Sequence, residues 1–373
     1  MNQAKPLIAI RSLRSEHHAN NIEPKVINVN WFLGKRCNYD CSYCSPTIHD
    51  WVSPHLKLNN IIDFVQQIND WALTQGKSFN ISLTGGEPFV HPEIIDILKI
   101  IRKASHYGTH LSATTNGSLP LDLYNHSLEF VTHLTISLHL ERSDDETKST
   151  LEKAIALTKA WPDKWINVQV MCLPGKLDFI DQQVIPLLES NQVKFTLRRI
   201  RPWLNEAVPE WQPLDKRNIL KSVYTIEQQT QMKEAEKQTL DLRLTEVYQS
   251  NSYYTADELD WFKNRVPATT WQNIGCWDEN KFYYEINSDI MVSNNHNQFL
   301  GWTCFAGVDS LYIDFDGLVY RGVCHNDGPL GKLGNKIEFP NTPTVCTKQW
   351  CTSNVDQTVR KAKSDSMHLI TND

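Results

Sequence analysis

The sequence predicts an α/β fold in which six parallel strands and their crossover helices form a partial (β/α)6 barrel, followed by a small C-terminal domain that contains a β-hairpin. Strand-like and helix-like segments alternate through the first 200 residues, and such alternation predicts a parallel sheet with right-handed crossovers. Polar and glycine-containing stretches follow four of the strands (LGKRC, TGGE, TTNG and SLH), at the sheet edge where barrel loops build active sites. Aromatic residues, short strand signals and five cysteines from Trp271 onward indicate the second domain.

The strands are predicted where β-branched and aromatic residues concentrate. They are Val26–Leu33, Phe79–Thr84, His110–Gly117, His133–Leu140, Trp165–Gly175 and Val193–Ile200. Between them, apolar residues recur at helical spacing, most clearly in the stretch that ends at Gly76. The predicted helices are Leu58–Gly76, His91–Gly108, Leu121–Thr132, Asp144–Ala160 and Asp178–Ser190.

A chain of 373 residues is long enough for one large domain and a smaller one. We expect an N-terminal extension at residues 1–25 and the barrel at residues 26–201. Residues 202–270 are rich in Gln, Glu and Lys and predict a solvated helical bridge. The second domain is expected at residues 271–373.

Composition excludes some classes of protein. Hydrophobic residues make up 40% and charged residues 21% of the chain, which is typical of a soluble globular protein. The net charge of −6 argues against a general nucleic-acid binder, which needs a basic surface, but leaves room for one nucleotide pocket. The N-terminal residues contain no signal-peptide core, and no apolar run reaches membrane-spanning length. A cytoplasmic protein is predicted, and there stable disulfides are rare.

The nine cysteines fall into two sets, which predicts two separate metal sites. The first set is Cys37, Cys41 and Cys44, spaced C-x3-C-x2-C in a polar loop. Three thiolates could bind zinc, with His49 as a fourth ligand, or an iron–sulfur cluster that keeps one iron without a protein ligand. A substrate or cofactor could then bind that open iron.

The first set, with Tyr43 directly before its last cysteine, resembles the signature of the radical S-adenosylmethionine (radical SAM) superfamily. Gly85-Gly86-Glu87-Pro88, at the end of the second strand, is similar to the GGEP motif of that family. Asn116, Ser137 and His139 follow on the third and fourth strands in the expected order. The resemblance covers the whole predicted barrel.

The resemblance implies that the three cysteines hold a 4Fe–4S cluster whose open iron is chelated by the amine and carboxylate of S-adenosylmethionine. It places the methionyl ammonium at the Gly85-Gly86 backbone near Glu87, and the adenine at the backbone of Tyr43. Asn116 and Ser137 would make polar contacts to ribose or carboxylate, and His139 would lie beside the cofactor. Simpler interpretations remain for two of these: Asn116-Gly117 is a common turn dipeptide, and His139 could be a strand-end histidine with a local partner.

Radical SAM chemistry implies reductive cleavage of S-adenosylmethionine to a 5′-deoxyadenosyl radical, which removes hydrogen from a small-molecule or peptide substrate. The electron donor would be a reductant such as flavodoxin or ferredoxin. Only about 25 residues precede the first strand, so the leader-binding module of many peptide maturases is not expected. The rival hypothesis is a non-catalytic iron–sulfur or zinc protein, which has no use for GGEP.

The second set is Cys304, Cys324, Cys346 and Cys351. Between the first two, SLYIDFDGLVY predicts a hairpin that turns at Asp316-Gly317. This segment, with Leu333–Asn335 after it, resembles the SPASM/Twitch domain, and four cysteines imply one auxiliary 4Fe–4S cluster. The usual spacing from the turn glycine to the cysteine is four residues, whereas six separate Gly317 and Cys324 here. A zinc ribbon is the alternative.

Two cysteines lie outside both sets. Cys276 is expected to be a buried thiol, with a fifth ligand or a substrate contact as alternatives. Cys172 ends a predicted strand at the barrel mouth. It is a candidate hydrogen-atom donor, although a packed strand cysteine is the simpler interpretation.

Overall fold

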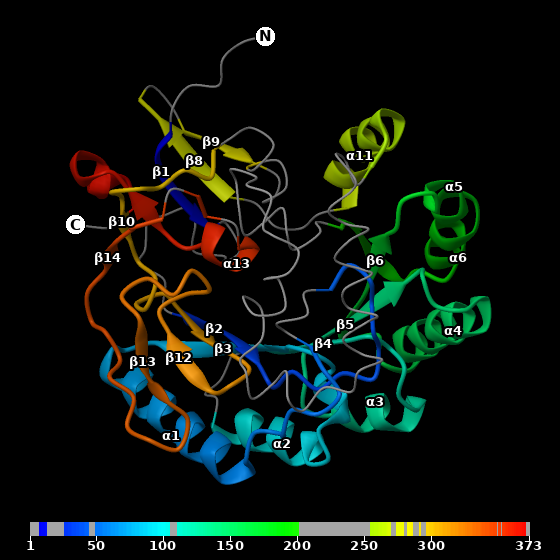
Figure 1. Ribbon diagram of the computed structural model, residues 1–373, viewed down its shortest axis with the longest axis horizontal. Helices are drawn as coiled ribbons and strands as arrows, with labels where there is room; N and C mark the ends of the chain where they lie inside the picture. The colour runs from blue at the N-terminus through cyan, green and yellow to red at the C-terminus, as the bar shows by residue number, and fades with distance from the viewer. Residues whose placement is uncertain are drawn as a thin grey trace, which may run out of the picture.

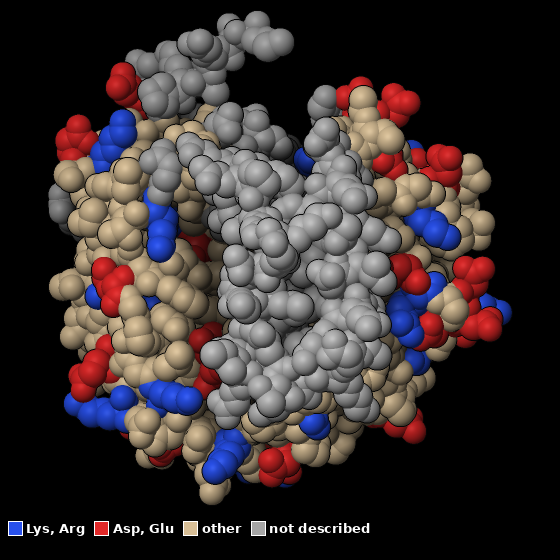
Figure 2. Space-filling model, in the orientation of Figure 1, with Lys and Arg blue, Asp and Glu red and all other residues tan. Residues whose placement is uncertain are grey.

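The computed structural model of the chain describes residues 7–12, 26–44, 49–104, 110–200, 254–269, 274–279, 282–285, 291, 296–348, 350–351 and 353–370. These residues form two sheets, one of nine strands and one of six. The larger sheet is curved, and helices cover its outer side (Figure 1). On the face shown in Figure 2, acidic and basic side chains are interspersed among the described residues.

The centre of the large sheet is the predicted barrel. Its strands are β2 (Val26–Phe32), β3 (Ser78–Thr84), β4 (Leu111–Thr115), β5 (His133–His139), β6 (Trp165–Cys172) and β7 (Lys194–Arg199). Each pairs in parallel with the next. The prediction of an α/β fold with six parallel strands is therefore confirmed, and the order of strands leaves the sheet open.

The connecting helices also follow the sequence pattern. They are α1 (Leu58–Thr74), α2 (Ile94–Ala104), α3 (Leu121–Ser127), α4 (Asp144–Ala160), α5 (Leu177–Phe179) and α6 (Ile185–Ser190). A π-helical turn at Ile180–Val184 interrupts the last predicted helix, and α3 is shorter than predicted. The first described turn of α4 has a capping box in which Ser143 and Glu146 satisfy each other's backbone N–H groups, a strong start signal.

Helix α1 shows how a helix is held on the sheet. Its buried face carries Ile61, Phe64, Val65, Ile68 and Ala72. The Phe64 ring meets the fully buried Trp31 of β2 edge to face, with ring centroids 5.2 Å apart. Each such buried side chain stabilises the fold by roughly 1.5–3 kcal/mol. The chain leaves the helix at Gly76, whose φ of +61° suits glycine.

The predicted C-terminal hairpin is present, and it extends the barrel sheet. Strand β11 (Ser310–Ile313) pairs in parallel with β2, β12 (Leu318–Tyr320) pairs antiparallel with β11, and β13 (Pro329–Lys332) follows. The four residues of β11 are all buried, between its parallel partner β2 and its antiparallel partner β12. The sequence did not predict that the hairpin and the barrel share one sheet.

The small sheet joins the two ends of the chain. Its strands are β1 (Leu7–Ser12), β8 (Ile274–Asp278), β9 (Phe282–Glu285), β10 (Thr303–Cys304), β14 (Thr344–Val345) and β15 (Lys361–Ala362). Strand β1, from the predicted N-terminal extension, lies between β15 and β8, and Figure 1 shows it beside β8. The predicted division into domains remains a prediction.

A buried ion pair connects the small sheet to the large one. The guanidinium of Arg360 donates to both carboxylate oxygens of Asp309, at 2.6 and 2.8 Å, and Lys77 lies 3.8 Å from the same carboxylate. Asp309 directly precedes β11, and Arg360 directly precedes β15. A bidentate pair of this kind fixes geometry as well as charge.

The predicted bridge at residues 202–270 lies mostly outside the described residues. Its described part contains α11 (Ala256–Thr269). Two shorter helical segments complete the C-terminal region, α13 (Asn354–Gln357) and a 3-10 helix at Ser364–Leu369. Within the described ranges, no helix is long and apolar enough to span a membrane.

Tyr254 fastens α11 to the last two barrel strands. Its hydroxyl donates to the carbonyl oxygen of Cys172 at 2.7 Å and accepts from the backbone N–H of Ile200 at 2.8 Å. Its ring packs edge to face on Phe262 of α11, with centroids 5.0 Å apart. The residue is 4% exposed.

Tyr254→Phe should lower the free energy of unfolding by about 1–3 kcal/mol, because it leaves a buried N–H and a buried carbonyl without their partner. Urea denaturation followed by circular dichroism would measure the change. Tyr320→Phe is the matched control, since it removes a hydroxyl from a buried tyrosine in the hairpin. Equal stability of Tyr254→Phe and the unaltered protein would show that the two bonds contribute nothing.

Candidate functional site

The first cysteine set occupies the loop after β2. The N–H of Cys37 donates to the carbonyl of Asp50 at 2.9 Å, and the N–H of Cys44 donates to the carbonyl of Cys41 at 3.0 Å. Cys41 is buried, whereas Cys37 and Cys44 are half-buried, and all three thiols are free. The loop is thus closed on itself and held to the segment that follows it.

The Gly85-Gly86 turn packs directly against this loop. The N–H of Gly86 donates to the carbonyl of Gly34 at 3.0 Å. A Cβ at Gly85 would lie 2.6 Å from that same oxygen, and one at Gly86 would lie 2.2 Å from the carbonyl oxygen of Lys35. Gly85 also has a φ of +127°, which side chains disfavour. The two glycines are required because the chain's own cysteine loop approaches them closely.

Glu87 is the buried centre of this turn. Its Oε1 accepts from the N–H of Phe89 at 3.0 Å and from the hydroxyl of Thr115 at 2.8 Å, while Oε2 accepts from the N–H of Asn116 at 2.6 Å. The residue is 2% exposed. Burial raises its pKa to about 7, and the three hydrogen bonds oppose that rise. The carboxylate therefore joins the end of β3 to the end of β4.

Asn116 links Glu87 to the cysteine loop. Its amide Nδ2 donates to Asn38 Oδ1 at 2.9 Å and lies 3.9 Å from Cys37 Sγ, and its Oδ1 accepts from the N–H of Ser118 at 3.0 Å. Gly117 follows with a φ of +73°. The dipeptide is therefore a turn, as its composition suggests, and its asparagine also faces the cysteine loop.

His139, at the end of β5, also faces the cysteine loop. Its Nδ1 lies 2.6 Å from the hydroxyl of Tyr43 and 3.3 Å from Cys41 Sγ, and the Tyr43 and His139 rings are stacked. Burial lowers the pKa of His139 to about 4, so the ring is neutral at pH 7. Ser137, two residues earlier on the same strand and 7% exposed, projects from the same face.

Sequence reasoning missed Glu141, which fixes the middle of the cysteine loop. Its carboxylate accepts from the N–H of Ser42 at 2.9 and 3.2 Å and from the Ser42 hydroxyl at 2.7 Å. Glu141 lies two residues beyond His139, on the same predicted strand-to-loop edge. That position, in a segment already identified as part of the site, was the signal available in the sequence.

The electrostatics around Cys37 and Cys41 favour thiols over thiolates in the protein alone. Burial raises the pKa of Cys37 to about 12. It raises the pKa of Cys41 still further, and Glu141, Cys44 and Cys37 add to that rise. Metal binding removes such protons, because coordination stabilises the thiolate directly.

The donor set fits an iron–sulfur cluster. It consists of three soft sulfur ligands, and the N–H of Tyr39 donates to Cys37 Sγ at 3.4 Å, the kind of bond that tunes cluster sulfurs. His49, the zinc alternative, lies 3.5 Å from Asp40. Within the described part of the chain, no three His, Cys, Asp or Glu side chains are grouped as they would be around one metal ion.

The second cysteine set gathers at the small sheet. Cys304 ends β10, Cys346 follows β14, and these two strands pair with each other. Cys324 follows β12 and Cys351 precedes α13. Burial raises the pKa of Cys324 to about 12, and the neighbouring Cys304 and Cys346 contribute to the rise. The four cysteines therefore lie close enough to influence one another's charge, although among the described residues no three of them are grouped as around a single metal ion.

Two buried charges accompany this set. Asp356 is 3% exposed and accepts from the N–H groups of Val323 and Cys324, at 3.1 and 2.9 Å. A Cβ at Gly322 would lie 2.7 Å from that carboxylate, which explains the glycine two residues before the cysteine. Burial alone would lower the pKa of Lys361, but Cys304, Cys351 and Asp356 raise it above its usual value.

The remaining cysteines are packed in the interior. Cys172 is fully buried at the end of β6 and donates to the carbonyl of Val170 at 3.4 Å. Burial raises its pKa, so it has the environment of a packed strand cysteine. Cys276 is fully buried in β8 opposite Ile10, as expected.

Lys35 connects the loop of the first cysteine set to the C-terminal hairpin. It is 4% exposed, and its ammonium lies 3.9 Å from the ring centroid of Phe315 in the hairpin turn. Burial lowers its pKa, while Asp316, Asp50 and Asp314 oppose the change. The loop that carries the first cysteine set therefore contacts the hairpin that precedes Cys324.

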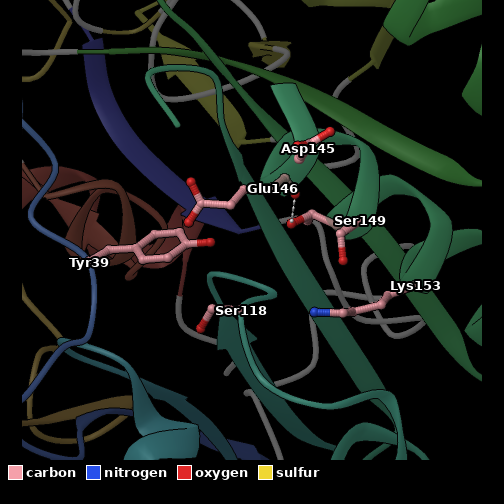
Figure 3. Close-up of a pocket in the computed structure, with 7 residues that line it drawn as sticks. Tyr39, Ser118, Asp145, Glu146, Ser149 and Lys153 are labelled. Atoms are coloured by element: carbon pink, nitrogen blue, oxygen red, sulfur yellow. Dashed lines mark hydrogen bonds between the residues drawn. The ribbon is translucent and has the colours of Figure 1, made fainter. Parts of the chain in front are cut away.

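A cavity of about 230 Å³ lies on the outer side of the cysteine loop. Tyr39 from the loop, Ser118 after β4 and the first turns of α4 line it (Figure 3). The Lys153 ammonium donates to the carbonyl of Gly117 at 2.8 Å, and Arg142 stacks over the Tyr39 ring at 4.4 Å. The first contact holds the turn after β4 against α4, and the second holds the cysteine loop against the segment that directly precedes α4.

The raised pKa of Glu87 predicts a pH dependence of stability. A carboxyl whose pKa rises from 4.5 to about 7 on folding stabilises the fold below pH 4.5, and that stability is lost as the pH rises toward 7. The loss should approach about 3 kcal/mol. Urea denaturation at several pH values, compared between the unaltered protein and Glu87→Gln, isolates this contribution because other groups titrate in both. A difference that stays constant between pH 4.5 and 7 would contradict the prediction.

The Radical SAM superfamily model matches residues 31–173. The chain is 30% identical over 110 residues to an S-adenosylmethionine-dependent nucleotide dehydratase of Psychrobacter lutiphocae, covering 27% of this chain and 36% of that protein. It is 31% identical over 172 residues to a GTP 3′,8-cyclase of Crocosphaera subtropica, covering 43% and 47%. The crystal structure of Streptococcus suis SuiB bound to precursor peptide SuiA is 12% identical, covering 87% and 67%, with a TM-score of 0.47.

The chain spans less than half of the length of each of these two curated relatives. The matched segment includes β3 to β5, the GGEP turn and all three cysteines of the first set. Residues 31–173 of the chain therefore match the Radical SAM superfamily model, and this segment carries the candidate site.

Proposed function

We propose that the protein cleaves S-adenosylmethionine reductively at a 4Fe–4S cluster held by Cys37, Cys41 and Cys44. The observation that carries the proposal is the way the ends of three neighbouring strands converge on one cysteine loop. Gly86 closes on the loop from β3, Asn116 from β4 and His139 from β5. A site in which the ligands are fixed by other elements is preorganised, as cofactor chemistry requires.

The residues around the loop have distinct proposed tasks. The three thiolates leave one iron of the cluster for the amine and carboxylate of S-adenosylmethionine. Gly85 and Glu87 remain the proposed neighbours of the methionyl ammonium, with Tyr43 at the adenine. Glu87 also positions Asn116 through its Oε2 bond. Ser137 and His139 project from β5 toward the same space.

When bound, the cluster and S-adenosylmethionine supply a 5′-deoxyadenosyl radical that removes a hydrogen atom from the substrate. The chain's own contribution is placement and shielding. The neutral ring of His139 and the amide of Asn116 lie beside cysteine sulfurs without adding charge. Helices cover the outer side of the parallel sheet (Figure 1), and Glu87, Asn116 and Ser137 at the strand ends are buried, which limits side reactions with water on that side of the site.

We propose an auxiliary 4Fe–4S cluster on Cys304, Cys324, Cys346 and Cys351. Four buried or half-buried thiols beside a buried lysine suit a fully ligated, anionic cluster. Such a cluster would accept or deliver an electron, or shape the substrate pocket. A zinc ribbon would use the same four ligands, and metal analysis distinguishes the two.

The substrate is proposed to be a small molecule or a peptide, and the reductant a flavodoxin or ferredoxin. Two similar proteins are named for nucleotides, a nucleotide dehydratase and a GTP cyclase. Nucleotides are therefore the small molecules to test first. The acidic net charge of −6 still argues against a nucleic-acid polymer.

The protein reconstituted without oxygen should contain about eight irons per chain, as two clusters of four. Colorimetric iron and sulfide analysis with metal-resolved mass spectrometry would measure this. A preparation with one zinc and only four irons would make the second site a zinc ribbon. One with zinc at both sites would overturn the proposed activity.

Replacing Cys37, Cys41 and Cys44 together with Ala should abolish formation of 5′-deoxyadenosine, because only the first site has an open iron. Replacing Cys324 and Cys346 with Ala should leave slow cleavage of S-adenosylmethionine in the presence of dithionite. Mass spectrometry of the reaction would detect 5′-deoxyadenosine in each case.

Loss of metal can unfold a domain that the metal supports, so circular dichroism and gel filtration must show that each variant is folded. Cys276→Ala is the matched control, since it removes a buried thiol that belongs to neither set. Normal 5′-deoxyadenosine formation by the folded triple variant would overturn the assignment of the first set.

A further inference from the structure

Lys361 is a buried cation at the second cysteine set. It is 1% exposed and lies in β15, directly opposite Cys304 of β10 in the antiparallel ladder. The buried cations among the described residues are Lys35, Arg360 and Lys361. Arg360 is neutralised by the bidentate carboxylate of Asp309, so its charge is already balanced.

The hydrogen bonds of Lys361 do not balance its charge. Its ammonium donates to two backbone carbonyl oxygens, those of Asp356 and Val359. Both acceptors are neutral, and an ammonium has three N–H donors. A buried ammonium is costly unless a negative charge lies nearby.

The nearby negative groups are those of the cysteine site. The side chain of Asp356 is turned toward the Cys324 loop, where its two oxygens accept the N–H groups of Val323 and Cys324. Asp356 is one negative neighbour of Lys361, and the sulfur atoms of Cys304, Cys351 and Cys346 are the others, with Cys304 as its ladder partner. Thiolates bound to an iron–sulfur cluster would supply that negative charge.

We propose that Lys361 is the counter-charge of the second cysteine set and raises the reduction potential of the cluster bound there. The inference rests on the proposed auxiliary cluster. One-electron reduction adds one negative charge to a cluster that is already anionic, while Lys361 keeps its proton and its position. A fixed positive charge in a low-dielectric interior stabilises the reduced state more than the oxidised state.

The test is a redox titration, with dithionite as reductant and electron paramagnetic resonance as readout. The triple Ala variant of Cys37, Cys41 and Cys44 serves as background, because it leaves only the second cluster. In that background, Lys361→Gln keeps N–H donors for the two carbonyls but removes the charge. We expect unchanged iron content and at least a tenfold fall in the ratio of reduced to oxidised cluster at a given potential, which corresponds to about 59 mV for one electron.

Two variants are matched to Lys361→Gln. Lys361→Arg keeps the charge and should restore most of the potential. Lys348→Gln removes a lysine that is two residues from Cys346 but exposed, and its charge is screened by water, so the potential should stay unchanged.

Each possible result supports or overturns the inference about Lys361. An unchanged potential in a folded, iron-replete Lys361→Gln variant would overturn the inference and leave the auxiliary cluster in place. A background protein with Lys361 intact that binds no iron would overturn the auxiliary cluster itself and the inference with it. If Lys361→Gln and Lys361→Met both lose iron while Lys361→Arg retains it, a buried positive charge is needed to hold the cluster, which supports the inference. Loss of iron in Lys361→Arg as well would reduce Lys361 to a packing role and overturn it.

Discussion

The parallel pairing of β11 with β2 is the constraint on which the arrangement of both cysteine sets depends. It runs from Ser310 opposite Asn28 to Ile313 opposite Trp31, so the first barrel strand has a partner on each side. The cysteine loop leaves the end of β2, and the hairpin turn leaves the end of β11, at the same edge of the sheet. The contact between Lys35 and Phe315 follows from that shared edge. Paired parallel strands run in the same direction, so their C-terminal ends lie at the same edge of the sheet. The cysteine loop and the hairpin turn therefore cannot separate at that edge without breaking the pairing of β11 with β2.

The sequence was informative where structure is local. Concentrations of β-branched and aromatic residues predicted all six barrel strands, and the predicted bounds of Asp144–Ala160 coincide with α4, whose start carries a capping box. Pairings between distant segments were not predictable. Strands β1 and β11 are short and take their partners from the other end of the chain, so no periodicity records which strand they join. Glycine patterns were similarly ambiguous: Gly85 and Gly86 were expected to admit a cofactor, whereas the structure presses them against the cysteine loop.

The residues of the candidate site also divide into those that the sequence identified and those that only the structure revealed. The cysteines, Glu87, Asn116 and His139 were identified from spacing and resemblance, because their identities are constrained by sulfur chemistry and by strand ends. Glu141 and Lys361 were missed. No fixed spacing in the sequence relates a glutamate to the serine it binds, or a lysine to the cysteine it faces across a sheet. Glu87 was assigned to the cofactor from resemblance, and the structure adds a second task. Its carboxylate accepts three protein donors and so sets the position of Asn116 relative to Cys37.

The two cysteine sets differ in exposure and in charge, and the difference bears on what each can do. In the first set, two of the three cysteines are half-buried, and the side chains beside their sulfurs are a neutral histidine, an amide and the carboxylate of Glu141. In the second set, three of the four cysteines are buried, and a lysine and an aspartate are enclosed with them. A cofactor as large as S-adenosylmethionine must reach its metal from outside, whereas an electron can reach a buried centre. An accessible set suits a cluster that binds a ligand, and an enclosed set with a fixed cation suits one that exchanges only electrons.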